Sequence, residues 1–375
     1  MQEKKIKVTY VLFQINKALG FEWVIDNLDK DKFELSFISI AAVENSPMEQ
    51  FCKQRGIPFF KVGYKSKWSI PEAILKVYKI LSAVKPNLVH CHIFEANIIG
   101  LTAAYFAGIK KRIYTRHHSN YHYLYAPSGR KYDLYCNIIA TDIIAISKNV
   151  QSILTNKENV PKEKIHLVHH GFDLSFFHSI VESRIEAVSK KYNPSRKSPV
   201  IGVISRYTKW KGLKYSIEAF NELLKNYPDA LLILANAKGE DTLKTKEYLR
   251  QLPDSSYVEI PFESDNAALF KLFDVFIHVP IDEYSEAFGQ IYVEALATGI
   301  PSIFTLSGVA SEFIVNRKNA LVVDFKSTEQ IYTSILTLLE DQPLRHQLID
   351  NGKNDVNQLF CLTTMIKKLE TIYSN

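Results

Sequence analysis

The chain alternates short apolar runs with longer segments in which apolar residues recur at helical spacing. Val200–Ser205 (VIGVIS) is apolar and rich in β-branched residues, which predicts a buried strand. The next segment, Lys211–Tyr227, places five apolar residues on one helical face: Leu213, Ile217, Phe220, Leu224 and Tyr227. Ala230–Ala235 (ALLILA) then repeats the strand pattern. Because these strands are apolar throughout, they predict a parallel sheet that helices cover on both faces.

The same alternation continues through both halves of the chain. In the second half, strands are expected at Tyr257–Ile260, Val275–Val279, Pro301–Leu306 and Ala320–Val323, and helices near Leu243–Leu252, Asn266–Phe273 and after the capping-box pattern Ser327–Gln330. In the first half, strands are expected at Val8–Phe13, Leu35–Ile40, Phe59–Val62, Leu88–Cys91, Ile113–Thr115, Ile143–Ile146 and Ile165–Val168. A last helix is expected over about Val356–Tyr373.

The chain is too long for one ordinary core, so its 375 residues predict two domains. A polar stretch with two prolines, Ser183–Pro199, marks the boundary. We therefore expect an N-terminal domain at residues 1–185 and a C-terminal domain at residues 186–355, each a doubly wound, Rossmann-like α/β fold. Such sheets bind ligands at the carboxyl ends of their strands, which predicts a cleft between two facing domains.

Two carboxylates bracket the start of one predicted helix in the C-terminal domain. Glu286 lies in the loop after a predicted strand, and Glu294 lies eight residues later, inside the helix. Gly289 lets a ligand approach the backbone, and the N–H groups at Phe288–Gln290 can accept a phosphate or a sugar hydroxyl. The sequence Thr298–Pro301 then ends the helix with Gly and Pro. Two acids at this spacing also occur by chance, so the prediction depends on the strand, the glycine and the helix exit together.

Two cations follow the first strand of the C-terminal domain. Arg206 comes directly after Val200–Ser205, and Lys211 opens the next helix. A pyrophosphate needs cations at its oxygens, and a guanidinium can bind two of them at once. Surface cations near a loop are common, but this position at the carboxyl end of a strand favours a binding role.

Adjacent histidines end a strand in the N-terminal domain. His117 and His118 follow Ile113–Thr115 closely, and His92 ends the strand before it. We expect these side chains to line the cleft. We expect no metal ion to bind at these histidines.

The segment Glu286–Glu294, followed by Ala295–Pro301, resembles the E-x7-E signature of retaining GT-B glycosyltransferases, in particular family 4. The resemblance covers most of the chain. Further segments similar to the family's pattern are Asp274–Pro280, Ser307–Glu312, Asn319–Asp324, Ala145–Ser147 and His170–Asp173. It implies the GT-B fold, with an acceptor-side N-terminal domain and a C-terminal domain that binds a nucleotide-sugar donor. It also implies that the last helix, about 356–375, crosses back onto the first domain.

The resemblance implies a role for each matching residue. Glu286 would contact the hydroxyls of the donor sugar, and Glu294 would bind the ribose. Arg206 and Lys211 would hold the donor diphosphate and stabilise the leaving group. Backbone groups that would meet the phosphate and sugar belong to Phe288, Gly289, Gln290 and Ile291.

The family also carries a histidine that contacts the donor sugar near its reacting carbon. This residue corresponds to His117, with His118 as the second choice. The first strand-to-helix loop departs from the family, which has two adjacent glycines followed by x-Glu. Here the loop Gln14–Glu22 keeps only Gly20 and Glu22, with Leu19 in place of a glycine.

These residues predict transfer of a sugar from a nucleotide diphosphate sugar, most often UDP-linked in the family, to an acceptor hydroxyl with retention. The GT-B class requires neither a metal nor another cofactor. Three alternatives stay open: a nucleotide-sugar epimerase, a phosphorylase that needs a lysine-bound pyridoxal cofactor, and a module that binds a nucleotide sugar without catalysis. Analysis of the products distinguishes an epimerase, because it needs no acceptor. A colourless purified protein would argue against the pyridoxal cofactor of a phosphorylase, and the absence of turnover would indicate a binding module.

The charge of the chain adds a membrane hypothesis. The net charge of +6 is too weak to indicate a nucleic-acid partner. Basic and aromatic residues nevertheless gather in the first half: Lys61, Lys65, Lys67, Lys110, Lys111, Arg112, Arg130 and Lys131, with Tyr64, Trp68, Tyr123 and Tyr125. This mixture suits an anionic lipid surface. We expect a glycan or lipid-linked acceptor, used in cell-surface polysaccharide or glycolipid synthesis.

The remaining composition indicates the compartment. The four cysteines, Cys52, Cys91, Cys136 and Cys361, are widely spaced, as in a reducing cytosol. Lys7 interrupts the first apolar run, so we expect a buried strand there and not a signal peptide. No apolar run is long enough to span a bilayer. The predicted location is the cytoplasm, with peripheral contact at the inner face of the cell membrane.

Overall fold

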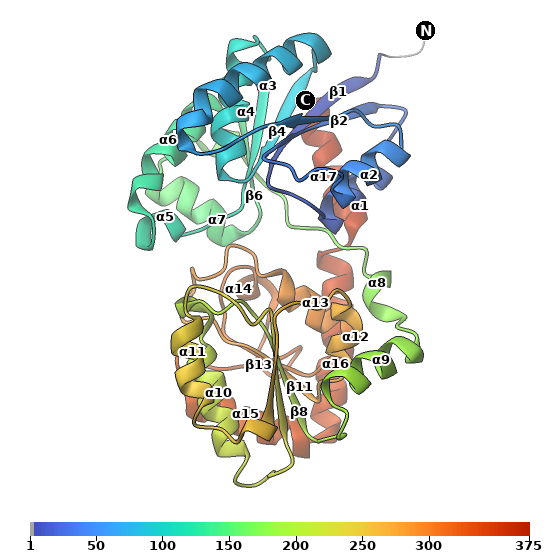
Figure 1. Ribbon diagram of the computed structural model, residues 1–375, viewed down its shortest axis with the longest axis vertical. Coiled ribbons are helices and arrows are strands. Elements are labelled where there is room, and N and C mark those ends of the chain that lie inside the picture. The colour runs from blue at the N-terminus through green and yellow to red at the C-terminus, as the bar shows by residue number, and fades with distance from the viewer. Residues whose placement is uncertain (1–3) are drawn as a thin grey trace. The chain divides into compact units, whose positions relative to one another are not determined.

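The computed structural model describes residues 4–375, which form two compact α/β units (Figure 1). Unit 1 comprises Met1–Phe172 and Leu362–Asn375, and unit 2 comprises Asp173–Cys361. Residues 1–3, part of the expected N-terminal domain, lie outside the described residues. The helix α9 (Glu182–Tyr192) belongs to unit 2, so this unit begins earlier in the chain than residue 186.

Within the described residues, unit 1 contains a seven-stranded sheet in the order β3-β2-β1-β4-β5-β6-β7. Its strands are β1 (Ile6–Phe13), β2 (Phe33–Ile40), β3 (Phe59–Val62), β4 (Leu88–His92), β5 (Lys111–Arg116), β6 (Asp142–Ala145) and β7 (Ile165–Leu167). All neighbours pair in parallel, and β1 runs beside β2 from Ile6 opposite Phe33 to Phe13 opposite Ile40. Parallel pairing explains the apolar strands, because helices cover both faces.

The helices of unit 1 form a layer on each face of this sheet (Figure 1). One layer contains α1 (Leu19–Asn27), α2 (Pro47–Gln54) and α17 (Leu362–Ser374). The other layer contains α3 (Ile70–Val84), α4 (Phe94–Phe106), α5 (Tyr121–Leu124), α6 (Arg130–Ile139) and α7 (Lys148–Ser152). The strand order places β1 at the point where the chain reverses direction across the sheet, with β4 beside it. Ligands bind at such switch points in open α/β sheets.

Unit 2 repeats this architecture with a six-stranded sheet, counted over its described residues, in the order β10-β9-β8-β11-β12-β13. Its strands are β8 (Val200–Ile204), β9 (Leu231–Ala235), β10 (Tyr257–Ile260), β11 (Val275–His278), β12 (Ser302–Phe304) and β13 (Leu321–Val322). Its helices are α8 (Ser175–His178), α9, α10 (Leu213–Leu223), α11 (Thr242–Leu249), α12 (Asn266–Phe270), α13 (Gln290–Thr298), α14 (Ala310–Phe313), α15 (Thr328–Glu340) and α16 (Gln342–Leu359). Here β8 and β11 flank the switch point.

The helices of unit 2 also divide between the two faces of the sheet. In Figure 1, α10, α11 and α15 lie on one side, and α9, α12, α13 and α16 lie on the other. The predicted face of α10 packs inward, because Leu213, Ile217 and Phe220 belong to the buried core. Burial of each such side chain contributes about 1.5–3 kcal/mol relative to an exposed one. The strand ends near α13 and α10 therefore belong to a well-packed scaffold.

The C-terminal segment differs from the expectation of one helix over Val356–Tyr373. α16 ends at Leu359, and α17 begins at Leu362. Phe360 has a non-helical backbone, and its ring packs edge-on against Phe313 and Phe288 in unit 2. This anchoring explains why the helix stops although the apolar spacing continues.

α17 then packs on unit 1, where its last turn joins a buried polar group. The hydroxyl of Tyr373 lies 2.5 Å from the hydroxyl of Tyr10 and 2.7 Å from Nδ1 of His90. The first strand and the last helix therefore meet at one sheet. In the described part of the chain, no helix combines the length and apolarity that a bilayer crossing needs.

Candidate functional site

The loop between β11 and α13 carries the predicted carboxylate Glu286. The residue is only 8 % exposed, and its backbone N–H donates a 3.0 Å hydrogen bond to Oγ of Ser307. Gly289 caps α13 with φ +86°, and an added Cβ would lie 2.5 Å from the ring of Tyr292. Only glycine tolerates this turn, which brings the start of α13 beside the carboxylate.

Two side chains from different strand ends converge on one oxygen of this carboxylate. Oε1 of Glu286 accepts hydrogen bonds from Nζ of Lys211 and, at 2.8 Å, from Nε2 of His278. His278 is the last residue of β11, and Lys211 ends a short 3-10 turn after β8. Gly212 permits this approach, because a Cβ there would lie 2.0 Å from the carbonyl oxygen of Val279. The predicted Glu286 and Lys211 therefore contact each other directly, and His278, which was not predicted, binds the same oxygen.

Electrostatics keep Glu286 ionised despite its burial. Burial alone would raise its pKa, but the charge of Lys211 and the hydrogen bond from His278 outweigh it and hold the pKa at about 2. Burial also lowers the pKa of His278, although Glu286 opposes that shift. A carboxylate only accepts hydrogen bonds, so the neutral imidazole must carry its proton on Nε2. The tautomer of His278 therefore follows from the geometry.

The predicted cation Arg206 lies just beyond β8 and has a different environment. Its side chain is exposed, and no described residue forms an ion pair with it. Lys211, in contrast, is only 15 % exposed. An exposed guanidinium can bind an anion without first breaking an internal ion pair. Arg206 therefore suits a diphosphate that arrives from solvent.

The second carboxylate of the signature, Glu294, lies in the middle of α13 and is part-buried. Burial raises its pKa to about 7. Glu286 and Glu294 thus have opposite shifts, because only Glu286 has cationic partners. A group that titrates near neutrality can gain charge when a hydrogen-bond donor approaches it.

The four backbone positions predicted to meet phosphate and sugar lie at the start of α13. Phe288 is buried, Gly289 is the cap, and Gln290 and Ile291 form the first turn. α13 has no side-chain cap. The N-terminus of a helix carries partial positive charge and outward N–H groups, which suit an anion.

Two of the predicted histidines of unit 1, His92 and His117, belong to a second polar group, buried or part-buried, at the ends of β4, β5 and β7. Nδ1 of His92 lies 3.0 Å from Nε2 of His117, whose ring stacks on His170 at 5.7 Å. His90 lies 4.1 Å from His92, ring to ring. Burial lowers the pKa of His117 to about 3 and that of His170 to about 4. All of these imidazoles are therefore neutral near pH 7.

His118 points to another cluster, although it is adjacent to His117. Its Nε2 lies 3.3 Å from Oδ1 of Asp133, and Nδ1 of His122 lies 2.6 Å from Oδ2. These three residues offer ligand atoms within 4.8 Å of one another and could hold a metal ion. The guanidinium of Arg116 already lies 3.0 Å from the same carboxylate and 2.6 Å from Glu158. We interpret the cluster as a buried ion-pair network, because a metal cation would meet that guanidinium.

The loop after β1 also differs from the expectation. α1 begins at Leu19, so Gly20 and Glu22 lie in its first turn and not in an extended loop. A Cβ on Gly20 would meet no atom within 4 Å. Packing within the protein therefore does not require a glycine at position 20. That Gly20 makes room for a ligand stays a prediction.

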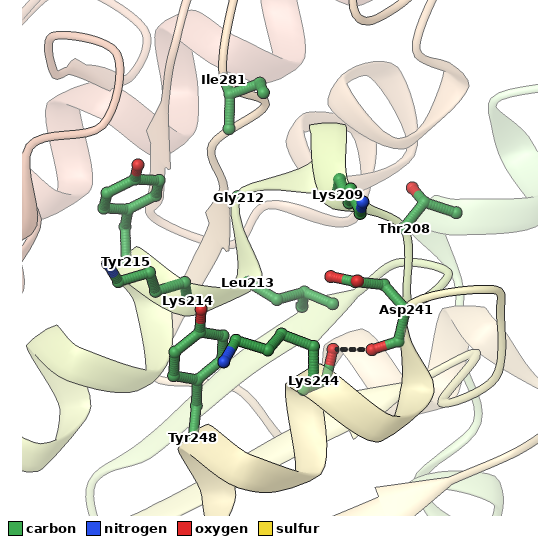
Figure 2. Close-up of a pocket in the computed structure, with 11 residues that line it drawn as sticks. Thr208, Lys209, Gly212, Leu213, Lys214, Tyr215, Asp241, Lys244, Tyr248 and Ile281 are labelled. Carbon is green, nitrogen blue, oxygen red and sulfur yellow. Dashed lines mark hydrogen bonds between the residues drawn. The ribbon is translucent and has the colours of Figure 1, made fainter. Parts of the chain in front are cut away.

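Figure 2 shows a pocket of about 250 Å³ between the first turns of α10 and α11. Three lysines, Lys209, Lys214 and Lys244, line it with two tyrosines, Tyr215 and Tyr248. Lys214 and Lys244 also pair with Glu218 and Glu247, and Asp241 adds a carboxylate. The described lining does not include Glu286, Lys211 or His278. The pocket therefore adjoins the group around Glu286 at Gly212, which follows Lys211, but does not share its side chains.

Sequence reasoning missed His278, His90 and His170 as parts of these groups. His278 was visible only as one polar residue in an otherwise apolar strand, Val275–Val279. That signal was usable, because a buried histidine needs a hydrogen-bond partner. Nothing in the sequence indicated which partner it would find.

Comparisons with known proteins agree with this architecture. Residues 184–355 match the family described as "Glycosyl transferases group 1", and residues 24–176 match "Glycosyltransferase Family 4". Two tandem parallel α/β units with these matches define a GT-B glycosyltransferase. The chain belongs to glycosyltransferase family 4, which confirms the predicted fold class and family.

Individual relatives are distant. The chain is 25 % identical over 311 residues to the capsular polysaccharide biosynthesis glycosyltransferase CapM of Staphylococcus aureus, covering 81 % of this chain and 80 % of that protein. It is 21 % identical over 310 residues to the Escherichia coli UDP-Gal:alpha-D-GlcNAc-diphosphoundecaprenol alpha-1,3-galactosyltransferase, covering 80 % and 79 %. Anabaena HepE, solved with UDP-glucose, superposes with a TM-score of 0.83 at 20 % identity, covering 99 % and 100 %. That last likeness shows the fold alone.

Proposed function

We propose that this glycosyltransferase moves a sugar from a nucleotide diphosphate sugar, with UDP as the nucleotide, to an acceptor hydroxyl with retention. The observation that carries the proposal is the buried Glu286 carboxylate, which Lys211 and His278 hold at the start of α13. Arg206 adds an exposed guanidinium at the neighbouring strand end. Two relatives support the donor class, because their names or complexes contain UDP-galactose and UDP-glucose.

The donor half of the reaction follows from these charges. The bond between the anomeric carbon and the phosphate oxygen breaks, and negative charge gathers on the leaving diphosphate. Arg206, Lys211 and the N-terminus of α13 stabilise that charge. Glu286 accepts hydrogen bonds from the sugar hydroxyls, and Glu294 accepts them from the ribose. Positive charge from these groups would replace a metal ion, so we expect turnover to survive a chelator.

Retention follows from a reaction on one face of the sugar. The acceptor oxygen forms its bond to the anomeric carbon on the face that the phosphate leaves, and the acceptor's proton passes to a phosphate oxygen. In this proposal Glu286 binds the sugar hydroxyls and does not act as a nucleophile. A two-step route through a glycosyl-enzyme is therefore disfavoured.

Unit 1 supplies the acceptor side in this proposal. His117 contacts the donor sugar near the reacting carbon as a neutral hydrogen-bonding group, since its pKa of about 3 keeps it uncharged. His92 lies within hydrogen-bond distance of His117. Gly20 and Glu22, in the first turn of α1, would contact the donor or the acceptor.

We further propose a glycan or lipid-linked acceptor in cell-surface polysaccharide or glycolipid synthesis. CapM is named for capsular polysaccharide, and the galactosyltransferase acts on a diphosphoundecaprenol. Exposed aromatic and aliphatic side chains on α5 and α6 suit peripheral contact with an anionic membrane: Tyr121, Leu124, Tyr125, Tyr132, Tyr135 and Ile138. Arg130 and Lys131 begin α6 and add positive charge. The cytoplasmic face of the membrane is then the site of the reaction.

A panel of UDP-, GDP- and ADP-sugars tests the proposal by thermal shift, because a true donor stabilises the folded protein by mass action. We expect one UDP-sugar to give the largest shift. NMR of the glycoside made from that donor must then show the donor's anomeric configuration. An inverted product overturns retention, and rearrangement of the donor without an acceptor indicates an epimerase.

A further inference from the structure

His278 ends β11 inside unit 2, and its surroundings fix its ring. The residue is 2 % exposed, and its ring packs edge-on against Tyr292 with centroids 4.9 Å apart. Tyr292 is itself fully buried, and its hydroxyl donates to the carbonyl oxygen of Thr305 at 3.2 Å. The imidazole therefore has little freedom to rotate away from Glu286.

The two groups that bind Oε1 of Glu286 differ in this freedom. Lys211 reaches the oxygen through a flexible four-carbon stem and has three donors that can turn to another anion. His278 offers one N–H from a packed ring, 2.8 Å from the oxygen. A diphosphate that competes for Lys211 can draw it away, but it cannot draw His278 away. The imidazole would then still hold the carboxylate through its hydrogen bond to Oε1.

We infer that His278 is a positioning residue, whose Nε2–H holds the Glu286 carboxylate in one orientation toward the donor sugar while Lys211 turns to the diphosphate. This inference rests on the proposed function. His278 touches neither sugar nor phosphate in this account, and it acts through Glu286. The inference also explains why a histidine is buried here although its second nitrogen, Nδ1, has no hydrogen-bond partner among the described residues.

Protonation follows the same geometry. The titratable groups that face Glu286 include Lys211 from the turn before α10, His278 from β11 and Tyr292 from α13. Burial raises the pKa of Tyr292 well above its usual value, so it stays neutral. Loss of the His278 donor removes one of the interactions that oppose the effect of burial on Glu286. The pKa of Glu286 should then rise.

Three variants of the full chain separate positioning from packing. His278→Leu keeps an apolar side chain of similar size but removes the donor. His278→Gln keeps an N–H at about the same distance from the backbone as Nε2. His166→Leu is a matched control, because His166 forms a comparable pair with Asp142 at 2.9 Å in unit 1, outside the proposed site.

We expect His278→Leu to lower kcat/KM about tenfold to 100-fold, as for a buried acceptor that loses its donor. Its UDP affinity should stay within about twofold, and the acid limb of its pH profile should move toward neutrality. His278→Gln should recover most of the rate, and His166→Leu should match the wild type. Unchanged turnover and an unshifted profile in His278→Leu would overturn the inference. Equal damage by Leu and Gln, with both proteins folded, would overturn it as well.

A carbon-13 NMR titration of the Glu286 carboxyl group keeps this test independent of turnover. The pKa of Glu286 should be higher in His278→Leu than in the wild type, and His278→Gln should restore it. If the wild-type protein turns over no nucleotide sugar, the proposed function fails, while the titration still decides the role of His278. If the titration shows no difference, the inference fails even when the enzyme is active.

Discussion

Two polar groups of the molecule, one around Glu286 in unit 2 and one around His117 in unit 1, respond to burial in opposite ways. Glu286 stays charged because Lys211 and His278 surround one of its oxygens. The histidines His90, His92, His117 and His170 lose their charge, because burial and their mutual repulsion disfavour protonation. One group is therefore built for charge and the other for neutral hydrogen bonds.

The difference shows that the neighbouring side chains determine the charge state of a buried group more than its residue type does. Glu294 is a carboxyl group on the same helix that Glu286 precedes, yet burial without a cation raises its pKa to about 7. His122 has an acidic partner in Asp133, whereas His92 and His117 lie against each other. Changes of pH and single substitutions should therefore affect the two groups separately.

The largest expected effect is the loss of stability in mild acid, and it should come from the histidines. Unfolded histidines titrate near pH 6.5 and the folded ones lower, so the unfolded state binds more protons as the pH falls below about 6.5. Each such histidine should cost about 2 kcal/mol of unfolding free energy at about pH 5. Urea unfolding at pH values from about 7.5 to 5 measures this loss.

The carboxylate Glu286 should not contribute in that window. Its folded pKa of about 2 lies below the unfolded value, so its stabilisation is lost only as the pH falls below about 4.3. His90→Phe should make the acid loss less steep, since Phe has no proton to bind. An urea midpoint that is constant down to pH 5 would contradict the assignment of neutral, buried histidines.

Substitution of Glu286 should have the largest effect on turnover. Glu286→Gln keeps the shape but removes the charge that Lys211 and His278 hold, and it removes an acceptor for sugar hydroxyls. We expect kcat/KM to fall about 100-fold to 1,000-fold, as for a group that binds the transition state. Asp142→Asn removes a carboxylate from the His166 pair outside the site and serves as the control. Equal loss in both variants would indicate damage to folding.

A smaller loss is expected for His117, and its dependence on pH matters more than its size. His117→Ala should lower kcat about tenfold to 100-fold, because one hydrogen bond near the reacting carbon is lost. The wild-type profile should show no limb from His117 near pH 6.5, since the pKa of about 3 keeps the ring neutral. A limb near 6.5 that disappears in His117→Ala would show that the imidazole titrates there. That result would contradict the contrast between a charged Glu286 and a neutral His117.

The smallest effect is expected for Glu294, with opposite signs on binding and stability. The folded carboxyl has a pKa above its unfolded value, so it destabilises the protein as the pH rises from about 4.3 through 7. Glu294→Gln should therefore stabilise the free protein by about 1–3 kcal/mol near pH 8. It should also weaken UDP binding about tenfold, because the ionised form accepts the ribose hydroxyls. Calorimetry that finds both properties unchanged would remove Glu294 from the nucleotide site.

Much of the fold could be predicted from the sequence, because apolar strands and helical spacing follow directly from burial. The strand near Val8–Phe13 and the helix after Lys211 lie where the pattern placed them, within a few residues. The break between α16 and α17 could not be predicted, because the apolar spacing continues through it. Contacts of Phe360 with residues distant in sequence decide that break.

The sequence predicted where the residues of the candidate site lie in the fold, but not which side chains contact one another. The end of a strand placed Arg206, Lys211 and Glu286 at one edge of a sheet. That Lys211 and His278 meet one oxygen depends on side-chain geometry over long sequence separations, which spacing does not encode. The separation of His117 from His118 also needed the structure, because adjacent residues point to different partners. The roles of these residues in catalysis stay predictions.

The central claim is that Glu286 binds the sugar of the donor and not its nucleotide. Isothermal titration calorimetry of UDP and of the best UDP-sugar, with the wild type and with Glu286→Gln, tests it most directly. We predict that the wild type binds the UDP-sugar more tightly than UDP, and that Glu286→Gln loses this difference while its affinity for UDP is unchanged. Equal affinities in the wild type, or a loss of UDP binding in Glu286→Gln, would contradict the account.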